Sequence, residues 1–247
     1  MILSLSNIGA KNTENKFLFF VLRYFSVNRV KNEMKDFCIL SDFDGTITTK
    51  DGLYSFIETY AEGDWQKIEQ DWTEGKISSK ECLTEEFNLV PNLSEELIDN
   101  FIKTLTIDEY FPEFYKNVTA KNIDFYITSD GIDYFIDRIL GKYGLNNLHI
   151  ISNHGEFKNG KFELTYPNDN PRCINNSGTC KCSVLMNLKQ QYNKIYYIGD
   201  GVSDFCVSSK ADILFAKSRL ASYCDEKGIK YIKYENFRDI EKSDILS

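Results

Sequence analysis

The sequence predicts an α/β protein built on a doubly wound parallel sheet, with a helical insertion after the first strand. Short apolar runs of about four to six residues recur along the chain, and each ends in a polar turn, as buried parallel strands do. Helical patterns lie between these runs, and such strand–helix alternation is typical of doubly wound sheets. Between about Asp51 and Glu113, apolar residues fall at helical spacings with no convincing strand.

The apolar runs and the helical patterns place the individual elements. The first strand is expected at Phe37–Leu40, and a hairpin with an Asn159-Gly160 turn is expected after Gly155. The other expected strands are Ile123–Thr128, Leu148–Ile151, Lys194–Gly199, Asp212–Ala216 and Ile229–Ile232. The expected helices of the core are Ile132–Tyr143, Ser183–Tyr192, Val202–Ser209 and Ser218–Lys227.

These elements divide the chain into three parts. Residues 34–50 and 114–247 are expected to form the α/β core, and residues 51–113 a helical cap. Residues 1–33 are expected to be an appendage outside the native protein, because Met34 directly precedes the first strand and no periodic element comes before it. The apolar run within residues 17–25 is too short to span a membrane and contains Arg23.

Composition limits the partners that the protein can have. A net charge of -8 argues against a protein that binds nucleic acid by neutralising phosphates, but it leaves room for a small phosphorylated ligand. The seven cysteines are an odd number and several fall in expected core elements, which predicts reduced thiols in a cytoplasmic protein. We expect no membrane partner, and a monomer or a homodimer.

Four carboxylates follow two of the expected strands. Asp42 and Asp44 come directly after the first strand, and Asp200 and Asp204 follow the strand that ends at Gly199. Because ligands of open α/β sheets bind beyond the carboxyl ends of the strands, these side chains should meet in one crevice. Four carboxylates would repel one another unless they shared a cation, and all-oxygen ligation suits Mg²⁺. Taken separately, the two clusters could be an ordinary Asp-Gly turn and an Asx turn.

A hydroxyl and an amine complete the candidate site. Ser129 follows the strand Ile123–Thr128, and its hydroxyl with the backbone N–H groups of Asp130 and Gly131 suits a phosphate oxygen at a helix N-terminus. A helix cap without any ligand would have the same sequence. Lys181 precedes the helix Ser183–Tyr192, and its position in the order of motifs distinguishes it from an ordinary surface lysine.

The order of these motifs resembles the haloacid dehalogenase superfamily. It consists of D-x-D-G-T at Asp42, a Ser after the next strand, then Lys181, and G-D-x-x-S-D ending at Asp204. The resemblance implies that Asp42 attacks the substrate phosphorus and that Asp44 acts as the general acid and base. It further implies that Mg²⁺ is held by the Asp42 carboxylate, the Asp44 carbonyl and Asp200, with Asp204 directly or through water. Ser129 and Lys181 would hold the phosphoryl oxygens.

The resemblance also narrows the reaction. Asp44 indicates a phosphatase or phosphotransferase, because haloacid dehalogenases lack this second Asp and transport ATPases have Thr there. The insertion resembles the cap of the phosphoserine-phosphatase-like branch. Segments such as SGTCKCSVL and YIGDGVSDFCVSSKADILFAKS look most like the 2-hydroxy-3-keto-5-methylthiopentenyl-1-phosphate phosphatases of methionine salvage. Phosphoserine and phosphocholine or phosphoethanolamine are the alternative substrates, although Asp130 stands where many phosphoserine phosphatases have Gly.

Three other interpretations stay open. Cys173, Cys180 and Cys182 could bind zinc with His154, but their spacing matches no common zinc signature. His149 and His154 could serve as acid or base, although Asp44 makes neither necessary. A non-catalytic module that binds phosphate ligands is the alternative from another class, and the intact carboxylates argue against it.

Overall fold

The computed structural model describes residues 34–173 and 176–243, and those from Lys35 onward belong to one compact unit. The expectation that residues 1–33 are an appendage therefore lies outside the described residues. Within the described ranges, no helix combines the length and apolar character that crossing a membrane requires.

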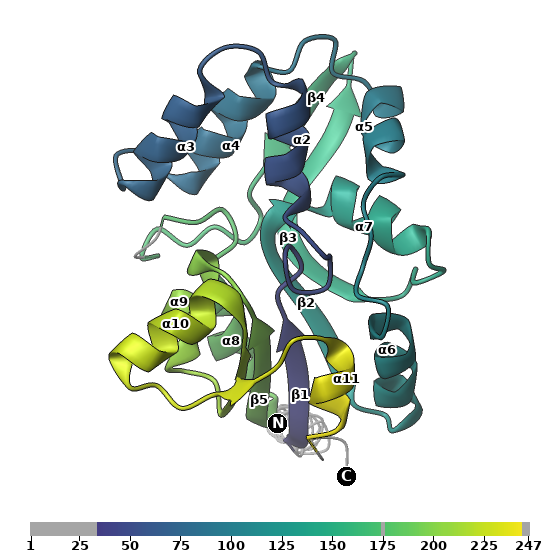
Figure 1. Ribbon diagram of the computed structural model, residues 1–247, viewed down its shortest axis with the longest axis vertical. Helices are drawn as coiled ribbons and strands as arrows, with labels where there is room; N and C mark the ends of the chain where they lie inside the picture. The colour runs from purple at the N-terminus through teal and green to yellow at the C-terminus, as the bar shows by residue number, and fades with distance from the viewer. Residues whose placement is uncertain (1–33, 174–175, 244–247) are drawn as a thin grey trace, which may run out of the picture. The chain divides into compact units, whose positions relative to one another are not determined.

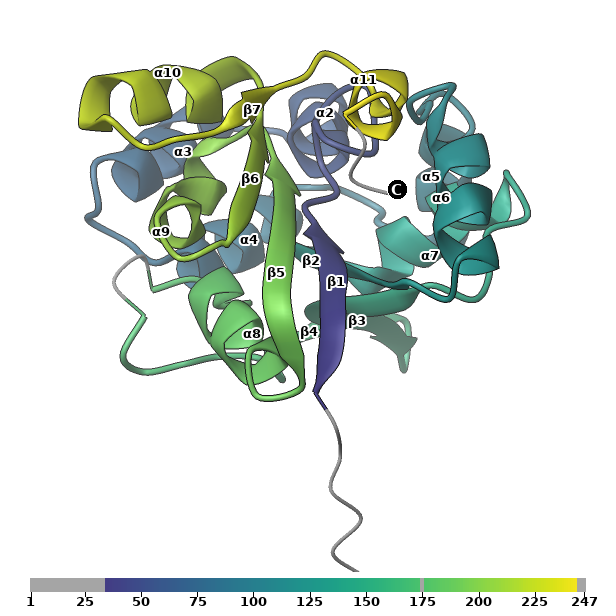
Figure 2. The ribbon, with the colours of Figure 1, turned by 90° about the horizontal axis from the view of Figure 1, so that it is seen from below.

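A seven-stranded sheet forms the centre of the core, in the order β4-β3-β2-β1-β5-β6-β7 (Figure 2). All neighbouring strands are parallel except β3 and β4, which form an antiparallel hairpin. This arrangement confirms the predicted α/β fold. The strands are β1 (Lys35–Ser41), β2 (Asp124–Ile132), β3 (His149–Lys158), β4 (Lys161–Thr165), β5 (Tyr192–Gly199), β6 (Ile213–Ala216) and β7 (Ile232–Lys233).

Helices cover both faces of this sheet, and further helices lie beyond its carboxyl edge (Figures 1 and 2). One face packs on α8 and α10, and the other on α6, α7 and α11, so that two separate apolar clusters form. The helices are α2 (Gly52–Tyr60), α3 (Trp65–Thr73), α4 (Ser79–Asn88), α5 (Glu95–Ile102), α6 (Phe111–Ala120), α7 (Asp133–Gly141), α8 (Lys181–Leu188), the 3₁₀ turn η1 (Val202–Asp204), α9 (Phe205–Ser208), α10 (Ser218–Lys227) and α11 (Phe237–Glu241).

The register of the sheet brings the ends of β1 and β5 together. Ser41 pairs with Ile198, and the Asp42 amide donates to the Ile198 carbonyl at 2.9 Å. Asp42 and Asp200 therefore leave the sheet from adjacent strands at the same edge.

Polar side chains cap the first turns of α2, α4 and α5. Asp51 accepts from the Tyr54 amide, and Ser94 accepts from the Leu97 amide. Ser78 forms a capping box with Glu81, which satisfies two backbone donors that a helix leaves unpaired. In the part of the chain that the structure describes, an isolated bridge between Thr48 and Ile107 is the only β pairing near this segment. The division into a core and a cap of residues 51–113 stays our proposal.

Beyond the residues of β3 that pair with β2, the hairpin packs against the cap helices, with β4 next to α4. Phe162 of β4 stacks on Phe87 of α4 with ring centroids 5.3 Å apart. Phe87 in turn packs against Phe56 of α2, which joins the same aromatic group. The predicted Asn159-Gly160 turn is present, with φ of 51° and 75°, the left-handed values that a tight two-residue hairpin needs.

Several element boundaries differ from those predicted. β3 continues through the expected turn after Ile151 into the hairpin. Tyr192 starts β5 instead of ending a helix, because its buried ring and hydroxyl pack against Tyr126 of β2. The strand expected at Ile229–Ile232 forms only at Ile232–Lys233.

Candidate active site

Three carboxylates meet at the carboxyl edge of the sheet. Asp42, Asp200 and Asp204 each offer an oxygen within 4.8 Å of the others. We call these three residues the acid triad. Their meeting follows from the register of β1 and β5 and from the short η1 turn that returns Asp204 toward β5.

Two glycines allow the acid triad to close. A Cβ on Gly45 would lie 2.6 Å from Asp200 Oδ2, and a Cβ on Gly199 would lie 2.4 Å from Asp204 Oδ2. Gly45 also has a φ of 73°, which residues with side chains adopt only at a cost. The glycine of the D-x-D-G-T motif is therefore required both for the backbone turn and for the approach of Asp200.

Lys181 lies between two members of the acid triad. Its Nζ is 2.8 Å from Asp42 Oδ1 and 2.7 Å from Asp204 Oδ1, and it also donates to Ser203 Oγ at 2.8 Å. The lysine is 2% exposed. It is the first residue of α8 rather than a residue ahead of a helix. This position sends a cation into the acidic site while keeping it away from solvent.

Asp204 is held by donors on all sides. Besides Lys181, its Oδ1 accepts from the Tyr197 hydroxyl at 2.6 Å. Its Oδ2 accepts from the backbone amides of Asp200 at 3.0 Å and Gly201 at 3.1 Å. Because every oxygen is satisfied, Asp204 is fixed in place although it is completely buried.

Burial and mutual repulsion set the electrostatics of the acid triad. Burial raises the pKa of Asp42 well above its ordinary value, and the Asp204 carboxylate raises it further, while Lys181 acts in the opposite direction. Burial also raises the pKa of Asp200, followed by the charge of Asp204. Burial lowers the pKa of Lys181, but Asp204 and Asp42 outweigh it, so the pKa lies above the ordinary range. The site holds more negative charge than one lysine balances.

Asp44 and Ser129 lie together beside the acid triad. Asp44 Oδ1 accepts from the Gly52 amide at 3.0 Å, and its Oδ2 accepts from Ser129 Oγ at 3.4 Å. Burial raises the pKa of Asp44 to about 7, with the nearby Asp51 carboxylate as the second cause. A carboxyl group with such a pKa can both give and take a proton near neutral pH.

Ser129 is not at a helix N-terminus, which corrects the sequence-based expectation. It lies within β2, which continues to Ile132 after a register shift beyond Thr128, and α7 begins only at Asp133. The Ser129 hydroxyl accepts from the Gly131 amide at 2.8 Å. Gly131 leaves room here, because a Cβ would lie 2.9 Å from Asp44 Oδ2.

Asp130 has partners within the protein. Its Oδ1 accepts from the Thr179 amide at 2.9 Å and from Asn153 Nδ2 at 3.3 Å. These bonds hold the segment that leads to Lys181 against β3. A contact between substrate and Asp130 stays a prediction, as do those with Gly131.

Sequence reasoning missed four side chains around the site. Tyr197 appeared as an ordinary strand residue, and Ser203 as part of a motif without a role of its own. Thr46 Oγ1 donates to Asp200 Oδ1 at 2.9 Å, and only its place in the D-x-D-G-T motif could have indicated this.

Lys217 follows β6, with an ammonium group 5.1 Å from the Tyr234 ring, and burial lowers its pKa. The charge of Asp200 raises the pKa of Lys217, and no spacing in the sequence indicates that these two residues lie close together.

The other candidates lie away from this arrangement. His154 Nδ1 is 2.6 Å from Asp133 Oδ2 on the hairpin side of the molecule. His149 stacks on Tyr126. None of the seven cysteines forms a disulfide. In the ranges the structure describes, neither group of neighbouring metal-ligand side chains includes Cys173, Cys180 or Cys182.

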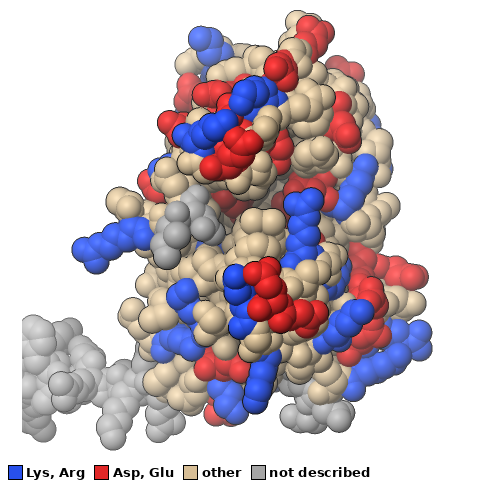
Figure 3. Space-filling model, turned by 60° about the vertical axis from the view of Figure 1, so that its left-hand side comes forward, with Lys and Arg blue, Asp and Glu red and all other residues tan. Residues whose placement is uncertain are grey.

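The acid triad has the donor chemistry of a magnesium site. Its ligands are carboxylate oxygens, which hard divalent cations prefer, and the excess negative charge calls for a cation. Gly45 lets the turn after Asp44 approach Asp200 closely, which brings the ligands nearer to one shared cation. These residues fit Mg²⁺. Figure 3 shows acidic and basic side chains mixed over one face of the molecule, without an extended basic field.

Comparison with known proteins gives matches along most of the chain. The family described as Putative Phosphatase matches residues 37–219. The 2-hydroxy-3-keto-5-methylthiopentenyl-1-phosphate phosphatase of Bacillus thuringiensis (strain Al Hakam) is 32% identical over 205 residues, which covers 82% of this chain and 93% of that protein. The protein of the same name from Exiguobacterium sp. is 29% identical over 204 residues, covering 82% of this chain and 94% of that protein.

A solved structure shares the fold. The phospho-aspartyl intermediate analogue of phosphoserine phosphatase superposes with a TM-score of 0.63 at 23% identity, covering 85% of this chain and 99% of that one. This chain therefore shares its overall fold with that structure.

Proposed function

Because this chain belongs to the Putative Phosphatase family, within the haloacid dehalogenase superfamily, and is a phosphatase, we propose that it hydrolyses a small phosphorylated metabolite through a phosphorylated Asp42. The observation that carries the proposal is the contact of Asp42 and Asp204 with one buried lysine, beside Asp200. A structural ion pair would need one carboxylate for this lysine, whereas three surround the site.

Asp42 is positioned to act as the nucleophile. Its Oδ1 accepts from the Phe43 amide at 2.7 Å and lies 2.8 Å from Lys181, while no donor among the described residues bonds to Oδ2. Oδ2 would attack phosphorus, so that an Asp42–phosphorus bond forms as the bond to the leaving oxygen breaks. The Asp44 carboxyl would give its proton to that oxygen, and the alcohol would leave.

The second half of the reaction would regenerate Asp42. Asp44, now ionised, would take a proton from water, whose oxygen attacks phosphorus and displaces the Asp42 carboxylate. The pKa of about 7 that burial gives Asp44 supports both roles. The Gly52 amide and Ser129 would hold Asp44 in place for both steps.

Mg²⁺ would be held by the carboxylates of Asp42 and Asp200 and by the backbone carbonyl of Asp44. When bound, it would offset the negative charge that gathers as phosphate enters. Because all four donors to Asp204 are protein groups, we propose that Asp204 contacts the ion through water. Lys181 and Ser129 would bind the oxygens of the transferred phosphoryl group.

For the substrate, we propose 2-hydroxy-3-keto-5-methylthiopentenyl-1-phosphate, the compound named in relatives matched over 93% and 94% of their length. The test is a comparison of kcat/KM for this compound, phosphoserine, phosphocholine and phosphoethanolamine with Mg²⁺ present. We expect the first to be preferred. A preference for phosphoserine by orders of magnitude would refute the substrate assignment. Loss of p-nitrophenyl phosphate hydrolysis in Asp42→Asn tests the phosphatase mechanism separately.

A further inference from the structure

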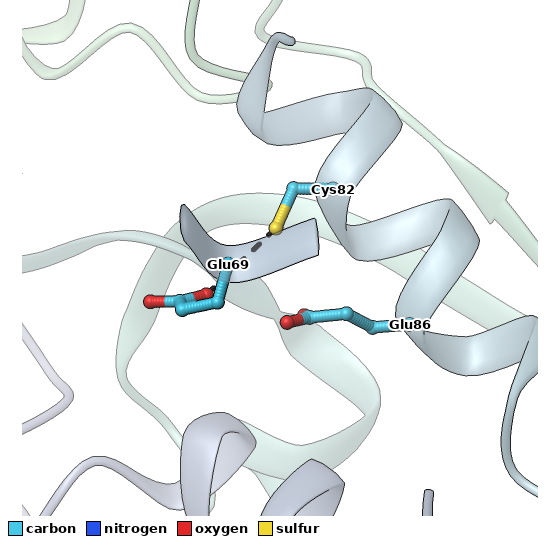
Figure 4. A group of neighbouring side chains, drawn as sticks. All are labelled: Glu69, Cys82 and Glu86. Atoms are coloured by element: carbon cyan, nitrogen blue, oxygen red, sulfur yellow. Dashed lines mark hydrogen bonds between the residues drawn. The ribbon is translucent and has the colours of Figure 1, made fainter. Parts of the chain in front are cut away.

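A second group of side chains with metal-ligand chemistry lies in the cap, apart from the acid triad. Cys82 and Glu86 are four residues apart on α4 and therefore share one face of that helix. Glu69 comes from the neighbouring helix α3. Figure 4 shows the two carboxylates and the thiol directed toward one space between these helices. Each residue offers a ligand atom within 4.8 Å of the others, and Cys82 Sγ lies 3.8 Å from Glu69 Oε2. We call these residues the cap triad.

The cap triad is largely buried and forms no ion pair with any residue that the structure describes. Glu86 is only 7% exposed and Cys82 only 4%. Among the described residues, no Lys, Arg or His forms an ion pair with Glu69 or Glu86, and Glu86 has no hydrogen-bond donor outside the cap triad.

The nearby lysines have other partners. Lys67 and Lys76 pair with Asp71, and Lys80 pairs with Asp169. Two carboxylates this close cannot both stay ionised unless a cation or a proton lies between them. Burial raises the pKa of Glu69, and the charge of Arg219 lowers it as a weaker effect, although Arg219 forms no ion pair with either glutamate. In the described part of the chain, neither the nearby lysines nor an arginine ion pair therefore balances the two carboxylates.

We propose that Glu69, Cys82 and Glu86 bind a divalent transition-metal ion of the zinc type, with water in the fourth position. A thiolate together with carboxylates suits Zn²⁺ and does not suit Mg²⁺, which prefers oxygen ligands only. On coordination, the Cys82 thiol loses its proton to solvent, and the ion replaces whatever proton the two carboxylates share. The ion would link α3 to α4. This site is independent of the proposed phosphatase mechanism.

Cobalt provides a probe that separates the two sites. Full-length, metal-free protein is titrated with Co²⁺ in the presence of excess Mg²⁺, which supplies the acid triad. Only cobalt bound to a thiolate gives strong sulfur-to-metal charge-transfer absorption in the near ultraviolet. We expect one equivalent of Co²⁺ to produce this band and Zn²⁺ to remove it. Cys82→Ser should abolish the band, and Glu86→Gln should weaken Co²⁺ binding by about ten-fold or more.

Cys224→Ser is the matched control. Cys224 is also buried in a helix, α10, but among the described residues it belongs to no group of neighbouring metal-ligand side chains, so this variant should keep the band. Far-ultraviolet circular dichroism checks that each variant folds, and Glu69→Gln replaces Cys82→Ser if the latter does not fold. Absence of the band in the wild type would overturn the proposal and leave a shared proton only. A band that persists in Cys82→Ser would assign the thiolate elsewhere and overturn it equally.

Discussion

Replacing Lys181 by Met should destabilise the folded protein strongly and in a pH-dependent way. The change keeps most of the side-chain volume but removes the cation that contacts Asp42 and Asp204. Breaking a buried ion pair in this way costs about 3–5 kcal/mol, because the remaining charge is buried and uncompensated. The expected loss is therefore about 3–5 kcal/mol of unfolding free energy at pH 8, in buffer free of divalent cations.

The sign of the pH dependence follows from the carboxylates. Without Lys181, the pKa of Asp42, already raised by burial, rises further, so the folded variant binds a proton that the unfolded chain releases above about pH 4. Keeping this carboxyl protonated costs about 1.4 kcal/mol for each pH unit above the pKa that it has in the unfolded chain, so this cost is larger at pH 8 than at pH 5. The deficit of the variant relative to wild type should shrink as the pH falls.

Urea unfolding followed by circular dichroism at pH 8 and pH 5 measures this difference. Lys189→Met is the matched control: Lys189 pairs with Asp212 at 3.3 Å, but both side chains are about one-third exposed. It should cost about 1 kcal/mol or less at either pH. A Lys181→Met deficit no larger than this control at pH 8, or one that does not shrink at pH 5, would refute the reasoning.

Three further substitutions test individual contacts of the site. Gly45→Ala should raise the Mg²⁺ concentration for half-maximal activity about ten- to hundred-fold, because the new Cβ would displace Asp200; unchanged Mg²⁺ dependence would contradict this. Asp44→Asn should abolish turnover. In metal-free buffer at pH 8 it should also stabilise the fold by roughly 2 kcal/mol, after allowance for the partial exposure of Asp44. The reason is that burial raises the pKa of this carboxyl to about 7, so that ionising it at pH 8 destabilises the folded protein. Lower stability of this variant at pH 8 would count against the raised pKa. Tyr197→Phe should cost about 1.5–3 kcal/mol in urea unfolding, because it removes a donor to the buried Asp204 carboxylate; a neutral result would show that Asp204 does not depend on it.

The order of the motifs predicted the residues of the acid triad, because the carboxyl ends of parallel strands lie at the same edge of the sheet. D-x-D-G-T after β1 and G-D-x-x-S-D after β5 needed only adjacency of these strands to bring Asp42 and Asp200 together. The fold class followed from the same alternation of apolar runs and helical patterns. The exact ends of strands did not, since β2 and β3 extend past their apolar runs through pairing that the local sequence does not encode.

The surroundings of the site depended on tertiary packing and escaped prediction. Tyr197 alternates with its neighbours along β5 as any strand residue would, and only the fold reveals that its hydroxyl reaches Asp204. The cap triad combines two residues on one face of α4 with one residue of α3. The four-residue spacing of Cys82 and Glu86 can be read from the sequence, but the proximity of Glu69 cannot. The packing of α3 against α4 brings Glu69 to Cys82 and Glu86, and sequence periodicity does not determine how two helices pack.

Asp42 Oδ2 is the proposed acceptor of the phosphoryl group. Rapid mixing of enzyme, Mg²⁺ and p-nitrophenyl phosphate, followed by acid quench and borohydride reduction, converts a phosphorylated aspartate into homoserine that mass spectrometry locates in the chain. We expect homoserine at position 42 in the wild type, and none in Asp42→Asn. Rapid turnover with no reduced residue at position 42, or with the reduced residue at another aspartate, would contradict it.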